Sequence, residues 1–348
     1  FSPRDWHVHE LLFGYVAAIV AGFLLTAIPN WTGRLPLQGP PLAGLVVIWL
    51  AGRFGVTLSS SIGWIGSAVL DCAFLVLMVA AVAREIVTGK NWRNLKMVVL
   101  LGLLAAGNIA FHLEAHFTGI AVYSTRVGIA VAVALIMVVG GRLIPSFTRN
   151  WLMQREPGRL PAPFDRFDEA CIVLSVCGLA LWVAVPEELT TGVMMIVAAG
   201  ANVLRLGRWA GDRTTADRLV LVLHVGYLFV PIGFLLSGLA AFDVVLPSAG
   251  IHAWTVGAIG IMTLAVMSRA SLGHTGRKLV ASPALQTVYA LATIAAVTRI
   301  CAVVHPAWGE TLLPVAALAW AAAFLGFAAL YMPLLCLPKR TIVRTTTR

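Results

Sequence analysis

The stretch LLFGYVAAIVAGFLLTAI, residues 11–28, contains no charged side chain and is long enough to cross the hydrocarbon core of a bilayer as a helix. Backbone groups in lipid must be hydrogen-bonded internally, and this stretch lacks the period-2 alternation of a barrel strand. Comparable apolar runs recur along the whole chain. We therefore expect eleven transmembrane helices, at residues 11–28, 41–60, 62–83, 97–115, 118–141, 168–185, 189–204, 218–238, 249–268, 284–304 and 312–335.

The composition leads to the same fold class. Of 348 residues, 59% are hydrophobic and only 11% are charged, whereas soluble domains carry about 25% charged residues. A chain this apolar must use lipid as the solvent for most of its surface. We expect one all-α, polytopic membrane domain over residues 1–348, with a division into two bundles at the segment 142–167, which is rich in Arg and Pro.

The net charge of +10 follows membrane topology and does not indicate a nucleic-acid partner. If residue 1 lies outside, all but four of the 25 Lys and Arg fall in the inner segments, as the positive-inside rule requires. The exceptions are Arg4 and Arg53, which fall outside, and Arg126 and Arg299, which fall within spans. This orientation places the C-terminus in the cytoplasm. Export of the N-terminus needs a preceding helix, so we expect twelve spans in the complete protein.

Histidines gather at the outer face of this topology. Six of the eight lie there: His7, His9, His112, His116, His252 and His305. Imidazole suits iron, copper and zinc, and helix bundles build such sites from side chains on facing helices. The alternative is that each is an ordinary polar residue at the membrane interface. The concentration favours a metal or haem site at the outer face.

The spacing of these histidines adds detail. His112 and His116 are four residues apart and so project from one helix face, although the sequence does not match the H-E-x-x-H pattern of metalloproteases. His7 and His9 diverge by about 200° if they are helical. Glu10 and Asn108 are candidates to orient the ligands from behind.

Charge within a predicted span is costly and usually functional, and three residues stand out on that ground. They are Asp71, Arg126 and Arg299. One interpretation is that Asp71 pairs with one of these arginines as a structural bridge. The other is that the arginines face an anionic group, such as haem propionates, beside the outer histidines. Asp71 is alternatively one step of a proton path.

The remaining two histidines lie toward the cytoplasmic side. His224 is about two turns into the eighth predicted span, and His274 follows the ninth. The glycine-rich segments around residues 140–150 and 271–277 also lie there. From spacing alone, these segments are typical of capped helix ends that carry the inner positive charge.

Long motifs in this chain resemble the NnrS family, over nearly its whole length. They are residues 6–14 (WHVHELLFG), 29–34 (PNWTGR), 111–114 (FHLE), 140–150 (GGRLIPSFTRN), 223–227 (LHVGY), 252–260 (HAWTVGAIG) and 272–277 (LGHTGR).

The resemblance implies a multi-pass protein of the bacterial inner membrane, usually with twelve spans, that contains haem and copper and takes part in the response to nitric oxide. The family pattern covers His7, His9, His112, His224, His252 and His274, but not His116 or His305. We therefore expect a principal haem or copper centre on the outer face, held by His7, His9, His112 and His252, with the haem of b type. His224 and His274 are candidates for a second, inner centre.

Three functions fit these expectations. The first is a haem- and copper-containing protein that binds nitric oxide and reduces it as an oxidoreductase, with a quinol or a redox protein as electron donor. The second is a transporter of a metal, haem or an iron–nitrosyl species, which a Gly-interrupted seventh span favours. The third is a membrane sensor that binds nitric oxide without turnover.

Overall fold

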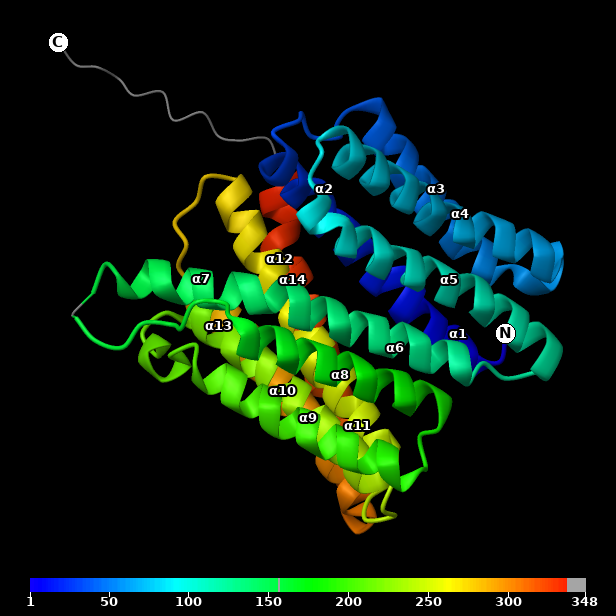
Figure 1. The fold of residues 1–348 in the computed structure, drawn as a ribbon. Helices are drawn as coiled ribbons and strands as arrows, with labels where there is room; N and C mark the ends of the chain where they lie inside the picture. Colours follow the sequence, from blue (N-terminus) through cyan, green and yellow to red (C-terminus); the bar gives the residue numbers. More distant parts are fainter. Residues whose placement is uncertain (156, 337–348) are drawn as a thin grey trace.

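The computed structural model describes residues 1–155 and 157–336 (Figure 1). Within these residues eleven helices are long and apolar enough to span a membrane, and no strand occurs, as the hydropathy pattern predicts. The first five spans are Pro3–Thr32 (α1 Pro3–His9, η1 Glu10–Val16, α2 Ala17–Thr32), α3 Pro40–Thr57, α4 Ser59–Thr88, Trp92–Thr118 (η2 Trp92–Asn94, α5 Leu95–Thr118) and Tyr123–Leu152 (α6 Tyr123–Leu135, η3 Ile136–Gly140, α7 Gly141–Leu152).

The other six spans complete the bundle. A short 3₁₀ turn, η4 (Gly211–Thr214), precedes the eighth span, and another, η6 (Pro306–Trp308), opens the eleventh. The spans are α8 Arg166–Ala184, α9 Leu189–Gly207, α10 Arg218–Ala240, Ser248–His274 (α11 Ser248–His252, η5 Ala253–Gly260, α12 Ile261–His274), α13 Pro283–Val304 and Pro306–Cys336 (η6, α14 Gly309–Cys336).

Local sequence sets where several helices begin and end. Ser2 caps α1 through a hydrogen bond to the backbone N–H of Asp5, and Asp165 forms a capping box with Asp168 at the start of α8. Gly33 and Gly119 end α2 and α5 in the left-handed conformation, with φ of 69° and 80°. These signals act on apolar segments whose backbone has no other hydrogen-bond partner in lipid.

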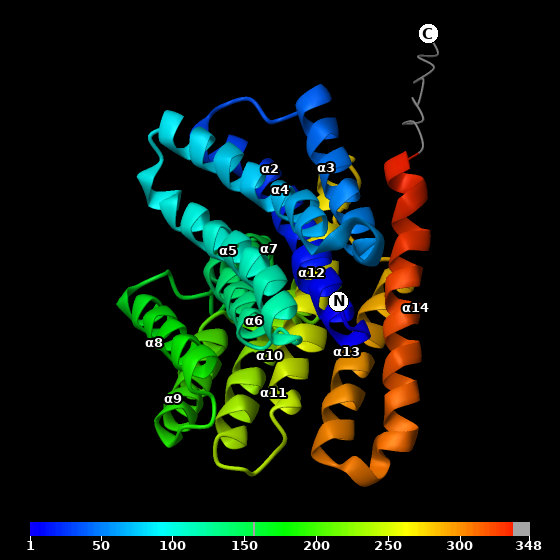
Figure 2. The ribbon, with the colours of Figure 1, turned by 90° about the vertical axis from the view of Figure 1, so that its right-hand side faces the viewer.

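Neighbouring spans pack side by side along the first half of the chain, in the order α3, α4, α5, α6. The spans built around α10 and η5 form the interior, and α14 lies at the edge (Figure 2). In α10, 67% of the most apolar window is buried, against 17% in the span that contains α14. Lipid-facing side chains such as Leu318 and Leu325 are more than two-thirds exposed, so α14 presents its surface to the bilayer.

Helical structure extends further than the sequence suggested at two places. The segment 142–167 was expected to be a linker, but α7 continues the fifth span as far as Leu152, and only the residues after it connect to α8. The interruption expected in the seventh span is also absent, because α9 is continuous through Gly200 and Asn202. Asn202 does not break α9, since its amide nitrogen donates to Ser175 Oγ at 2.8 Å. The inner positive charges predicted beyond residue 336 lie outside the described residues.

Three π-helical segments occur in the described part of the chain: η1, η3 and η5. Two of them begin immediately after a histidine, since η1 follows His9 and η5 follows His252. π-helical turns are rare and are found frequently at functional sites. They place unusual backbone geometry in the first, fifth and ninth spans, close to the motifs singled out in the sequence.

Candidate metal centre

Three spans bring a cluster of polar side chains together inside the bundle. His9 ends α1, Asp71 lies on α4, and Asn108 and His112 lie one turn apart on α5. His9 and Asn108 have no exposed surface, while Asp71 and His112 are 1% and 3% exposed. The N-terminus lies beside the link between α5 and α6 (Figure 1), where Asp5 Oδ2 accepts from the backbone N–H of Ala121 at 3.4 Å.

Both imidazoles point their Nε2 atoms at one carboxylate oxygen. His9 Nε2 lies 3.1 Å and His112 Nε2 lies 3.0 Å from Asp71 Oδ2. Ligand atoms of the three residues all lie within 4.8 Å of one another, as a single bound metal ion requires. Two imidazoles and one carboxylate suit Cu(II) or non-haem Fe(II).

Neighbouring polar groups hold these ligands in place. The Asn108 amide nitrogen donates to Asp71 Oδ2 at 2.8 Å, and its oxygen lies 2.9 Å from His9 Nε2. Glu10 Oε1 lies 3.3 Å from His9 Nδ1. Outer partners of this kind fix ring orientation in metal sites. Of the two residues proposed from the sequence to orient the histidines, Glu10 thus lies next to His9 Nδ1 and Asn108 next to His9 Nε2.

Arg53 completes the cluster. The topology counted it with the outer charges, although residue 53 falls inside the second predicted span. It lies within α3 and forms ion pairs with Asp71 Oδ1 and, at 2.6 Å, with Glu10 Oε1. The structural bridge expected for Asp71 thus uses Arg53, and neither Arg126 nor Arg299 takes part. With neutral imidazoles, two carboxylates and one guanidinium leave the cluster with a net charge of −1, which attracts a cation.

Aromatic rings surround the two histidines and exclude water. The His9 ring lies 5.2 Å from the ring of Phe111 and 5.5 Å from that of Phe13, measured between centroids. The His9 and His112 rings themselves lie 5.1 Å apart. The cluster thus lies in a low-dielectric environment, where charge pairing is strong. The close packing of these rings leaves no room for a porphyrin between the two imidazoles.

The other histidines predicted at the same end do not join this cluster. His7 is exposed on α1, because a helical backbone turns it away from His9. His116 is exposed and stacks on Trp64 with centroids 4.2 Å apart, and His305 lies beside Trp308. The pair formed by His112 and His116 therefore does not act as one ligand set, since only His112 faces the interior.

His252 occupies a separate place at the start of the ninth span. It is half-buried, and both Arg299 and His7 interact with it electrostatically. Arg126, by contrast, donates to the carbonyl oxygen of Val183 at 3.2 Å and lies over the ring of Tyr123. The two intramembrane arginines thus contact different parts of the bundle. Of the two, only Arg299 lies close to a predicted histidine ligand.

His224 and His274 are not members of this cluster. His274 and His252 lie near opposite ends of the ninth span, Ser248–His274. His224 is 7% exposed and its Nε2 lies 2.8 Å from Thr148 Oγ1. Its Nδ1 is buried beside Gly211 and has no hydrogen-bond partner among the described residues.

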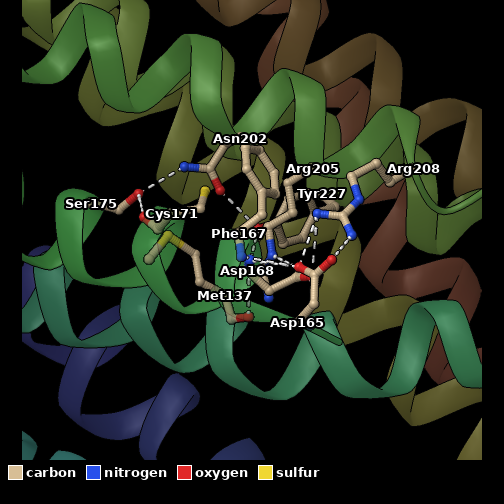
Figure 3. A network of polar contacts seen from close by, with 10 residues as sticks. All are labelled: Met137, Asp165, Phe167, Asp168, Cys171, Ser175, Asn202, Arg205, Arg208 and Tyr227. Atoms are coloured by element: carbon tan, nitrogen blue, oxygen red, sulfur yellow. Dashed lines mark hydrogen bonds and ion pairs between the residues drawn. The ribbon is translucent and has the colours of Figure 1, made fainter. Parts of the chain in front are cut away.

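A second polar network, which the sequence did not reveal, joins α8, α9 and α10 (Figure 3). Arg205 was counted as an inner loop charge, but it lies in the last turn of α9 with no exposed surface. Its guanidinium donates to Asp168 Oδ1 at 2.8 Å, to the Tyr227 hydroxyl at 2.9 Å and to the carbonyl oxygen of Met137 at 3.1 Å. Burial of the charge is offset by these partners.

The network explains part of the Gly-Gly-Arg motif at residues 140–142. A Cβ on Gly141 would lie 2.1 Å from Arg205 Nη2, so the guanidinium packs directly against the glycine backbone. Trp209 covers the other side, with the guanidinium carbon 5.2 Å from its ring. The motif therefore has a packing role in addition to ending η3, and the helix-end interpretation from spacing is incomplete.

At the exposed edge of this network, Asp165 caps α8 and pairs with Arg208 at 2.5 Å. The Arg208 guanidinium lowers the pKa of Asp165 from 3.8 to about 2. Because the folded-state pKa is depressed, the stabilisation is complete above about pH 4 and is lost as the pH falls toward 2.

Replacing Asp165 by asparagine, which keeps the helix cap, is expected to lower the melting temperature slightly at neutral pH. The difference from the unchanged protein should shrink between pH 4 and pH 2, as measured by thermal unfolding in detergent. A difference that stays constant through this range would contradict the role of the charge.

Comparison with known proteins decides the family. Residues 1–339 match the sequence model of the family described as NnrS protein. The chain belongs to the NnrS family. No curated protein and no solved structure matches it.

Membership in the NnrS family, together with the eleven apolar helices, makes this chain a multi-pass membrane protein of the nitric oxide response. The NnrS motif at residues 6–14 contains two members of the polar cluster, His9 and Glu10, and the FHLE motif supplies His112. Asp71 and Arg53 lie outside every motif quoted above, so they are cluster residues that only the fold reveals.

Proposed function

We propose that this NnrS-family protein holds copper at His9, Asp71 and His112, and that it binds and reduces nitric oxide. The observation that carries the proposal is the convergence of two imidazole Nε2 atoms on one buried carboxylate oxygen, at 3.1 and 3.0 Å. Two nitrogen ligands and one oxygen ligand suit Cu(II), which also ranks highest in affinity among the divalent first-row metals.

The chain's own groups prepare the site for a cation. Arg53 neutralises one carboxylate charge and holds Asp71 Oδ1, which leaves Oδ2 directed at the two histidines. Asn108 bonds to both His9 and Asp71 and so fixes their relative orientation. When bound, a redox-active copper ion would supply one-electron chemistry and a position for nitric oxide, while Phe13 and Phe111 exclude water.

We further propose that haem, where the protein holds it, is bound on the side of His252. Arg299 and His7 lie close enough to act on this histidine electrostatically. Cationic groups beside an imidazole suit a ligand with anionic propionates. The inner membrane location and a cytoplasmic C-terminus, which follow from the charge pattern, complete the proposal.

His112→Ala is expected to remove the copper from the purified protein, because it deletes one of three ligands. The matched control is His116→Ala, which lies one turn further on α5 and is exposed. Metal analysis by mass spectrometry should find copper lost in the first variant and retained in the second. Equal copper in both variants, or no copper in the unchanged protein, would contradict the assignment of copper to this cluster.

Optical spectra and turnover assays separate the functional alternatives. A Soret band that shifts with dithionite and nitric oxide is expected, and the absence of this band would contradict the proposal that the protein binds haem. Steady-state consumption of nitric oxide with a quinol donor is expected for a reductase. Uptake of nitric oxide only in stoichiometric amounts would instead indicate a sensor, and copper or haem movement across vesicle membranes would indicate a transporter.

A further inference from the structure

A cavity of about 90 Å³ lies between four spans and is open on one side. Its walls come from η1 and α2, from α6, η3 and α7, from α10, and from η5 and α12. The residues that line it include Val16, Ile136, Val139, Ile259, Met262 and Thr263.

The lining of this cavity is apolar. Thr263 is the one lining residue whose side chain carries oxygen or nitrogen. Its hydroxyl is already satisfied, since it donates to the carbonyl oxygen of Gly260 and accepts from the Tyr15 hydroxyl, both at 2.9 Å. A buried water needs two to four polar partners, which this cavity does not offer. The cavity therefore excludes water and suits an apolar occupant.

The three π-helical segments all border this cavity. Val16 ends η1, Ile136 and Val139 belong to η3, and Ile259 belongs to η5. Three of the four surrounding spans thus depart from α-helical geometry at the same place. π-helical turns are rare and are found frequently at functional sites, so the coincidence of three of them around this cavity indicates a function.

The cavity lies close to the polar cluster formed by His9, Asp71 and His112. Val16 follows His9 by seven residues on the same span, which corresponds to about 10 Å along the helix axis. Phe13 lies between them in sequence, and its ring contacts that of His9 at 5.5 Å between centroids. The cavity wall and the cluster therefore lie about two helical turns apart on the first span.

We propose that this cavity is a docking site for a diatomic gas, which enters from the bilayer and waits there before it reaches the metal cluster. An apolar cavity of about 150 Å³ takes benzene or xenon, so the smaller volume here suits xenon or a diatomic molecule. Small uncharged gases dissolve in hydrocarbon, which gives them access without a polar channel. That the gas is nitric oxide rests on the proposed function, whereas the docking site itself does not.

Xenon is the probe for the docking site, because it needs no metal and is located by its anomalous scattering. Crystals of the full chain under xenon pressure are expected to show a peak between Val16 and Val139. Ile259→Ala enlarges the cavity and should raise the occupancy, while Val139→Phe fills it and should abolish the peak. Val69→Phe, at a lipid-facing position that is 65% exposed, is the matched control and should leave the peak unchanged.

If neither the unchanged protein nor the Ile259→Ala variant shows a xenon peak, the proposed docking site is overturned. Continuous density for a lipid acyl chain in the cavity would also overturn it. For the link to the cluster, Val139→Phe should slow nitric oxide binding about tenfold at unchanged metal content, with Val69→Phe unaffected. An unchanged rate would overturn this link, and a protein without metal that still binds xenon would overturn the proposed function alone.

Discussion

Arg205→Met is expected to lower the free energy of unfolding by about 3–5 kcal/mol, because it leaves the buried Asp168 with only a longer ion pair, to Arg208 at 3.7 Å. Asp168 is 4% exposed and loses its 2.8 Å partner, while the Tyr227 hydroxyl and the Met137 carbonyl oxygen each lose a donor. Denaturation of the purified protein in mixed micelles, followed by circular dichroism, measures the change.

Arg208 provides the matched control for this prediction. It lies one turn beyond Arg205, but its side chain is 27% exposed and its partner Asp165 is 52% exposed. Arg208→Met should therefore cost only about 0–1 kcal/mol. The double variant Arg205→Met with Asp168→Leu should recover most of the loss, since it removes both buried charges. Similar costs for the two single arginine variants would contradict the importance of burial.

Asp71→Asn is expected to weaken copper binding by at least about 100-fold, which is the upper end of the effect of losing an outer partner. The substitution keeps the size of the side chain but removes the negative charge to which His9, His112 and Arg53 are directed. Titration with a competing chelator measures the affinity. Arg53 retains its 2.6 Å pair with Glu10, so the helices around the cluster should remain folded.

The control for Asp71 is Asp5, another carboxylate that is 1% exposed on the first span. Asp5 accepts a hydrogen bond from the backbone N–H of Ala121, and none of its contacts within the described residues is with His9 or His112. Asp5→Asn should therefore leave copper affinity unchanged. Equal weakening in both variants would show that loss of a buried carboxylate, rather than loss of a ligand, is responsible.

Part of the site could be predicted from the sequence, and the reasons differ from residue to residue. His9 and His112 were found because histidine is uncommon in apolar helices and the topology placed both at one end. Asp71 was recognised as a costly intramembrane charge, but its partners were not, since pairing depends on which helices are neighbours. Arg53 was counted with the outer charges although it falls inside the second predicted span, so its pairing with Asp71 was missed.

The same limit applies to Arg205, which composition and position marked as a cytoplasmic charge. Its burial depends on Asp168 and Tyr227, which lie 37 and 22 residues away in sequence. A single sequence without its fold contains no signal for such distances. The coincidence of three π-helical turns around one cavity is equally invisible, because insertion of one residue into a helix leaves the apolar pattern intact.

Hydropathy and charge by themselves determined the fold class and the number of spans in this chain, because lipid imposes helices on any long apolar segment. The motifs around His9 and His112 indicated the NnrS family and a metal-binding role. Only the tertiary structure decided which polar groups meet. It separated His112 from His116, joined Asp71 to Arg53, and left His252 apart, because contacts in a bundle are set by packing between helices that are distant in sequence.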